Sequence, residues 1–167
     1  MSSAVIVSLR IAATPARVFE AFTQDIAAWW RPDPLFAITP RGDGVLRFEG
    51  GEGGRLISEW APGKVYEVGK ITTWSPPTEL SSGKLVFTWR PASLPPELAT
   101  EAEVIFEAVA EETRVTVTHR GWAEIPRDHA VRHSFPEQLF LRHVGMWQRA
   151  QLKSLAVLSA GRVDVKR

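Results

Sequence analysis

The chain has no cysteine among its 167 residues. Disulfide scaffolds, thiolate zinc sites, iron–sulfur clusters and cysteine nucleophiles are therefore excluded, and nothing requires an oxidising compartment. No stretch approaches the roughly 18 apolar residues that a membrane-spanning helix needs. Residues 1–11 lack the basic start and the apolar core of a signal peptide. We therefore expect a cytoplasmic protein that does not act at a membrane.

The chain also has little net charge. Its 20 Lys and Arg residues balance 19 Asp and Glu residues, for a formal charge of +1 at pH 7. Such a balance does not favour nucleic-acid binding. A hydrophobic content of 44% with 23% charged residues is typical of a folded globular chain. The length predicts a single domain over residues 1–160, followed by a polar, frayed tail over 161–167.

Tryptophan, by contrast, is abundant. Seven Trp and 8 Phe stand beside a single Tyr. Aromatic rings in such number either fill a core or line a pocket, and a chain of this size has room for both.

Hydrophobic periodicity predicts the order of the elements. Alternation over 5–11 predicts a strand, and Thr14-Pro15 predicts the N-cap and first position of a helix over 15–23. A second short helical turn is expected over 25–30. Apolar residues that recur every three or four positions predict one long helix over about 136–160. Turn-forming residues between these helices delimit candidate strands at 35–39, 45–49, 55–61, 64–74, 79–90, 100–110 and 113–120.

This order predicts an α+β fold, in which a curved antiparallel sheet of six to seven strands wraps around the long C-terminal helix. A straight helix cannot touch all of a strongly curved sheet, so we expect a cavity between them. The alternative is that the rings fill this space as ordinary core. The predicted ligand-binding residues are Trp29, Trp60, Tyr66, Trp74, Phe87, Trp89, Phe106, His119, His143 and Trp147.

Four segments carry a resemblance to a known family. They are ATPARVFEAFT at 13–23, IAAWW at 26–30, PPTEL with LVFTW at 76–89, and TRVTVTHRG at 113–121 before the long helix. In this order they resemble the START-like, or Bet v 1-like (SRPBCC), superfamily with its helix-grip fold. Within it, the chain is most similar to the family named after the activator of Hsp90 ATPase. Met146 departs from the pattern by separating Gly145 from Trp147, and segments 91–100 and 121–135 look longer than usual.

The resemblance implies a cavity but not one activity, so three functions stay open. The first is binding of a small hydrophobic or aromatic molecule. The second is an enzyme of the same fold, cyclase-, dehydratase- or hydrolase-like, with His119, His143, Tyr66 and Glu59 as candidate polar groups. The third is an Hsp90 co-chaperone with a role in the stress response. The full activator carries a further N-terminal domain, and we expect the co-chaperone function to be less favoured because this chain begins at the first strand.

No catalytic residue, metal site or cofactor is assigned from the sequence. His129 and His133 are spaced like two metal ligands on a helix, but no suitably placed carboxylate completes an HExxH-type signature. His119 falls on the apolar face of its strand, where it could orient a ligand, alone or with His143. The alternative is a core histidine whose hydrogen bonds go to the backbone or to a carboxylate. The oligomeric state is also open, and a homodimer could form through a sheet edge or the tryptophan-rich loops.

Overall fold

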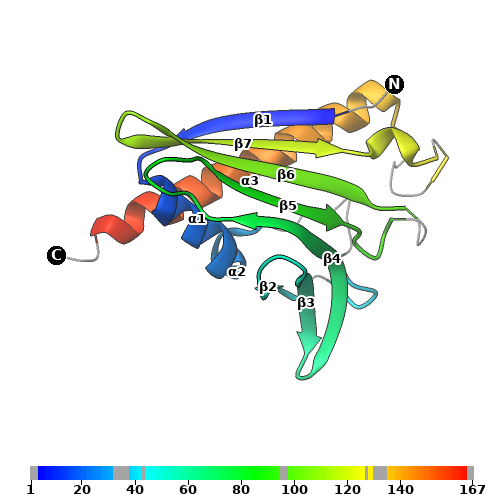
Figure 1. Ribbon diagram of the computed structural model, residues 1–167. Coiled ribbons are helices and arrows are strands. Elements are labelled where there is room, and N and C mark those ends of the chain that lie inside the picture. The colour runs from blue at the N-terminus through cyan, green and yellow to red at the C-terminus, as the bar shows by residue number, and fades with distance from the viewer. Residues whose placement is uncertain are drawn as a thin grey trace.

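The computed structural model describes residues 4–31, 38–42, 44–94, 98–126, 128–129 and 135–164, the last four through their backbone only. Seven antiparallel strands form one sheet in the order β1-β7-β6-β5-β4-β3-β2 (Figure 1). The first strand therefore pairs with the last, and β1 and β2 form the two edges. The strands are β1 (Ala4–Ile11), β2 (Val45–Glu49), β3 (Arg55–Ala61), β4 (Lys64–Ser75), β5 (Gly83–Trp89), β6 (Thr100–Val109) and β7 (Glu112–Arg120).

The first helix begins where the sequence predicts. The Thr14 hydroxyl accepts a hydrogen bond from the backbone N–H of Arg17 at 3.2 Å, and Pro15 occupies the first turn. This cap supplies one acceptor for the unpaired amides of a helix start. The helix α1 (Pro15–Gln24) is followed at once by the short α2 (Ile26–Trp29).

The long helix α3 (Glu137–Asp164) crosses the same face of the sheet as α1. In Figure 1 it runs behind β1 and β7, and its C-terminal half lies beside α1. The side chains between helices and sheet are apolar, as strand alternation predicts. Residues 85, 87 and 89 of β5, 102, 104 and 106 of β6, and 115, 117 and 119 of β7 are all buried. The predicted α+β helix-grip architecture, with its sheet of six to seven strands, is confirmed.

Two predicted boundaries are wrong, and a third prediction is only partly covered by the described residues. The strand predicted over 79–90 begins only at Gly83, because residues 76–82 form a loop in which the Thr78 hydroxyl accepts hydrogen bonds from the N–H groups of Leu80 and Ser81. In the strand predicted over 35–39, residues 35–37 lie outside the described part, and Thr39 makes only an isolated bridge to Gly42. The helix predicted to end at 160 continues to Asp164.

The far end of the sheet is a separate structural region. There, β3 and the adjoining half of β4 project away from the helices (Figure 1), while β2 contacts α1 and α2. A register shift interrupts the pairing of β3 with β4 beside Gly69. A Cβ at Gly69 would overlap the carbonyl oxygen of Thr88 on the neighbouring strand. Glycine is therefore required for the close approach of β4 to β5 at this bend. We call this region the charged hairpin, because its outward side chains form ion pairs that include Arg47–Glu59 and Arg55–Glu49.

Candidate functional site

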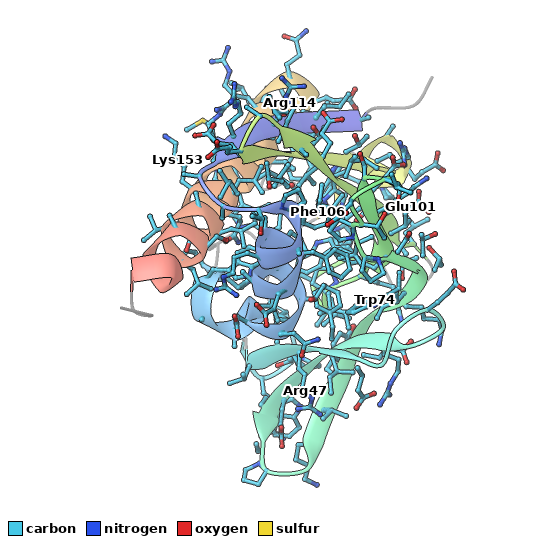
Figure 2. All side chains as sticks on the ribbon, turned by 60° about the vertical axis from the view of Figure 1, so that its left-hand side comes forward. Arg47, Trp74, Glu101, Phe106, Arg114 and Lys153 are labelled. Atoms are coloured by element: carbon cyan, nitrogen blue, oxygen red, sulfur yellow. The ribbon has the colours of Figure 1, made fainter. Side chains whose placement is uncertain are left out.

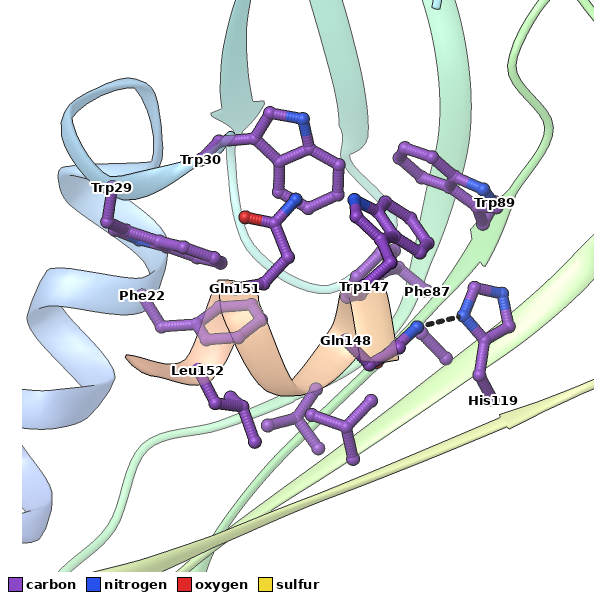
Figure 3. A pocket seen from close by; sticks show the side chains of 13 residues that line it. Phe22, Trp29, Trp30, Phe87, Trp89, His119, Trp147, Gln148, Gln151 and Leu152 are labelled. Atoms are coloured by element: carbon purple, nitrogen blue, oxygen red, sulfur yellow. Dashed lines mark hydrogen bonds between the residues drawn. The ribbon is translucent and has the colours of Figure 1, made fainter. Parts of the chain in front are cut away.

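A small cavity lies between α3 and the sheet (Figure 3). Its volume is about 40 Å³. One water molecule needs about 10–15 Å³ on this measure, and pockets for drug-sized ligands span about 300–1,000 Å³. The space therefore holds a few waters and is otherwise filled by protein. Its lining consists of Phe22, Trp29, Trp30, Phe87, Trp89, Ala102, Val104, Val117, His119, Trp147, Gln148, Gln151 and Leu152.

Four indole rings from three elements meet around this cavity. The ring centroids of Trp30 lie 5.2 Å from Trp89 and 5.5 Å from Trp147, and Trp89 lies 5.8 Å from Trp147. Trp29 extends the group, at 5.8 Å from Trp30. These separations are typical of favourable aromatic pairs. We call Trp29, Trp30, Trp89 and Trp147 the aromatic cluster.

A hydrogen-bonded chain of polar groups closes one side of the cavity. Thr100 Oγ1 donates to the carbonyl oxygen of Trp89 at 3.0 Å and lies 2.6 Å from His119 Nε2. The other ring nitrogen, Nδ1, lies 2.7 Å from Nε2 of Gln148, as Figure 3 shows. The Thr100 hydroxyl has one proton, which it donates to the Trp89 carbonyl oxygen. His119 therefore donates from Nε2 and accepts at Nδ1 from the Gln148 amide.

The same geometry keeps His119 neutral. The side chain is 2% exposed, and burial lowers its pKa to about 3. Desolvation disfavours the imidazolium, and no described carboxylate bonds to the ring to offset it. With both nitrogens engaged by the protein, His119 has no proton-accepting site to offer a ligand. Its geometry is that of a positioning residue for Gln148.

The helix α3 also holds the segment that carries the tryptophan pair. Gln151 accepts from the N–H of Arg31 at 2.8 Å and donates to its carbonyl at 2.7 Å. One turn later, the Ser154 hydroxyl donates to the carbonyl of Trp29 at 2.6 Å. These three bonds fix the backbone on both sides of Trp30. The Trp30 side chain itself is only half-buried, and its Nε1 has no hydrogen-bond partner among the residues that the structure describes.

Five of the predicted site residues are brought together by the structure. Trp29, Phe87, Trp89, His119 and Trp147 all line the cavity. Their neighbours Phe22, Trp30, Gln148, Gln151 and Leu152 were not among the predicted site residues. For Gln148 and Gln151 a signal existed: both fall within the helix turns whose apolar residues face the sheet.

The structure places the other five predicted residues elsewhere. Phe106 lies in the core beneath α1, with its ring centroid 5.1 Å from Phe19, and Figure 2 shows it inside the molecule. Trp74 lines a groove of about 440 Å³ between α1 and the loop after β4. The remaining three are likewise not among the lining residues. Trp60 lies in the charged hairpin, with the Arg41 guanidinium over its ring. The Tyr66 hydroxyl lies 3.4 Å from the Arg90 carbonyl oxygen, and His143 is half-buried on α3.

The predicted pairing of His119 with His143 is not formed, because the polar partners of His119 are Thr100 and Gln148. Of the two histidines with metal-ligand spacing, His133 lies outside the described residues. Within the described residues, no group of three His, Asp or Glu side chains could hold a metal ion. No helix in the described part of the chain is long and apolar enough to span a membrane.

Comparison with known proteins agrees with this geometry. A search of curated proteins finds no match, but solved structures with the same helix-grip fold match nearly the whole chain. Protein MLL2253 from Mesorhizobium loti is 17% identical with a TM-score of 0.63, covering 96% of this chain and 98% of its own. The Aha1 dimer from Colwellia psychrerythraea (19%, TM-score 0.61) and PFC0360w, an HSP90 activator from Plasmodium falciparum (20%, TM-score 0.60), each cover 93% of this chain and 94% of their own.

The fold and the cavity under its long helix thus define a protein of the helix-grip class. The model of the family described as activator of Hsp90 ATPase homolog 1-like protein matches residues 12–156. The chain belongs to this family.

Proposed function

We propose that the protein binds a small apolar or aromatic molecule in the cavity between α3 and the sheet. The observation that carries the proposal is the enclosed aromatic lining, in which indole rings from α2, β5 and α3 face one space. Among the described residues, none of those lining the cavity is charged. Apolar walls with a few placed polar groups are the usual composition of small-molecule sites.

Binding requires the cavity to enlarge, because about 40 Å³ is too small for a benzene ring. Trp30 is the side chain best placed to move. Its ring is half-buried, and Gln151 and Ser154 hold the backbone on both sides of it. Within the described part of the chain, its enclosed Nε1 lacks a hydrogen-bond partner. An outward rotation of this ring would hydrate the indole N–H while leaving the fold unchanged. We propose that ligand takes the place of the Trp30 ring.

The test is a titration with p-xylene, an uncharged aromatic probe, followed by the indole N–H signals in ¹⁵N–¹H NMR spectra. Binding should shift the signals of the aromatic cluster and leave that of Trp60 in place, because Trp60 lies in the charged hairpin. A Trp30→Ala variant should bind p-xylene more tightly, since it no longer has to displace the ring. Failure of both proteins to bind aromatic probes would overturn the proposal.

A second candidate function is action on an Hsp90 ATPase, because the family description names this ATPase and one of the similar structures, PFC0360w, is described as an HSP90 activator. A purified Hsp90 whose ATPase rate rises with added protein would support it. An unchanged rate, with binding of the chaperone excluded by sedimentation, would remove it. A homodimer through the edge strands β1 or β2 is also a proposal, and sedimentation of the protein alone tests it.

The contacts of His119 and Glu59 do not favour acid–base catalysis by these two residues. His119 has both nitrogens engaged, and Glu59 lies in the charged hairpin, where its carboxylate accepts from the Gly63 N–H at 3.0 Å. We therefore propose binding rather than turnover.

A further inference from the structure

The polar chain at the cavity wall leaves one acceptor unused. His119 accepts a hydrogen bond at Nδ1, so the amide nitrogen of Gln148 must face the ring and its carbonyl oxygen, Oε1, must face away from it. Among the described residues, none donates a hydrogen bond to Oε1. Gln148 retains 8% exposure and lines the cavity. The other lining glutamine, Gln151, has both ends of its amide bonded to Arg31.

We propose that the cavity selects uncharged aromatic molecules that donate one hydrogen bond, through a hydroxyl or a ring N–H, and that Oε1 of Gln148 accepts it. This inference rests on the proposed function, because it specifies the chemistry of the ligand for the same site. Gln148 is the specificity-determining residue, and His119 is a positioning residue that fixes which end of the amide is presented.

The surroundings of Gln148 favour such a ligand over alternatives. A charged group would lose its hydration among side chains that carry no compensating charge. A purely apolar ring would fit the walls but would leave the amide oxygen unpaired once water is displaced, which is unfavourable. A flat ring with one donor satisfies both the indole walls and the single acceptor.

Two pairs of matched probes test the proposal. p-Cresol and p-xylene differ by a hydroxyl in place of a methyl group, and indole and benzofuran differ by a ring N–H in place of an oxygen. The measured quantity is the preference, the dissociation constant of the probe without a donor divided by that of its partner. Replacing the acceptor in a Gln148→Met variant should lower this preference about tenfold, as expected for a lost buried hydrogen bond.

A Gln138→Met variant is the matched control, because Gln138 is an exposed residue on the same helix. Its preference should equal that of the unmodified protein. A loss of preference in the Gln148→Met variant supports the proposal. A loss for the cresol pair alone identifies the donor as a hydroxyl, a loss for the indole pair alone identifies it as a ring N–H, and a loss for both pairs means that either donor is accepted. Equal preferences in the Gln148→Met variant and the unmodified protein would overturn it and leave the proposed function standing. If none of the four probes binds, the proposed function fails, and this inference with it.

The unmodified protein supplies a second test that does not depend on a variant folding. The ¹⁵N shifts of His119 should show a neutral ring protonated at Nε2 and unprotonated at Nδ1. A nuclear Overhauser contact should join bound p-cresol to the side-chain amide of Gln148. The opposite tautomer would mean that Gln148 presents its NH₂ group to the cavity, and would overturn the proposal.

Discussion

The aromatic cluster and the charged hairpin lie in different parts of one fold and are held together by different forces. Trp29 and Trp89 of the cluster are at most 2% exposed and pack ring against ring. In the hairpin, the side chains of Arg55 and Glu49 form a 2.7 Å ion pair while each remains 39% exposed. Figure 2 shows Arg47 of the hairpin at one end of the molecule, far from Arg114 and Lys153. The free energy of unfolding should therefore depend mainly on the cluster, because burial stabilises more than exposed ion pairs do.

The largest expected effect comes from truncating the same residue type in each region. Trp89→Ala should lower the free energy of unfolding by about 4 kcal/mol, because it removes a buried indole and leaves a cavity. Trp60→Ala should cost only about 1 kcal/mol, because Trp60 is half-buried and contacts the Arg41 guanidinium at 5.4 Å. Urea denaturation measures both. Similar losses for the two variants would mean that the hairpin is as important to stability as the cluster.

The second-largest loss of stability is expected at Gly69, where the charged hairpin joins the rest of the sheet. Gly69→Ala should destabilise the protein by about 3 kcal/mol, because the added Cβ meets the Thr88 carbonyl of a paired strand that cannot move freely. Gly51→Ala is the matched control. Its Cβ would contact the Trp74 ring at an ordinary 3.4 Å. The urea midpoint of Gly69→Ala should be lower than that of Gly51→Ala if β4 must approach β5 closely at the bend. Equal midpoints would show that β4 shifts to make room for the added Cβ.

Much of the fold could be predicted from the sequence. Alternation assigned residues 85, 87 and 89, residues 102, 104 and 106, and residues 115, 117 and 119 to the buried face, since a strand points every second side chain to the same side. Thr14-Pro15 located the helix start because the cap is a local interaction. The architecture followed from the order of the elements.

The composition of the site could not be predicted to the same extent. Strand alternation says that Trp74 and Phe106 face inward, but not that α1 lies over them while α3 lies over Trp89. That division depends on how the helices cross the sheet, which periodicity does not encode. The pairing of Gln148 with His119 joins positions 29 residues apart through a register set only by packing.

Acid should affect the two regions over different pH ranges. Burial lowers the pKa of His119 to about 3 in the folded state, so between pH 6.5 and 3 the unfolded chain binds the extra proton. The contribution of His119 to stability is complete above pH 6.5 and falls by about 1.4 kcal/mol for each unit below it, or about 2 kcal/mol by pH 5. In the hairpin, the Arg55 hydrogen bond lowers the pKa of Glu49, and its contribution is lost only at pH values below 4.5.

Urea denaturation from pH 7.5 down to pH 5 measures the contribution of His119 alone, because the contribution of Glu49 is lost only at lower pH. A His119→Gln variant is the control, because it has no group that titrates at this position. The gap in stability between the two proteins should shrink steadily as the pH falls below 6.5. A gap that stays constant would show that His119 becomes protonated in the folded protein, and that the cluster is more hydrated than its burial indicates.

The smallest effect is expected for the shortest ion pair of the hairpin. A double-mutant cycle of Arg55→Met and Glu49→Gln should give a coupling close to experimental error, because water solvates both exposed side chains and competes with the 2.7 Å contact. Whatever coupling is found should vanish at about 1 M salt, where the screening length falls to about 3 Å. The same cycle on His119→Phe and Gln148→Met should give a coupling that salt does not change, since both groups are buried. A large, salt-resistant coupling in the hairpin would mean that Arg55 and Glu49 are less accessible to water than their 39% exposure indicates.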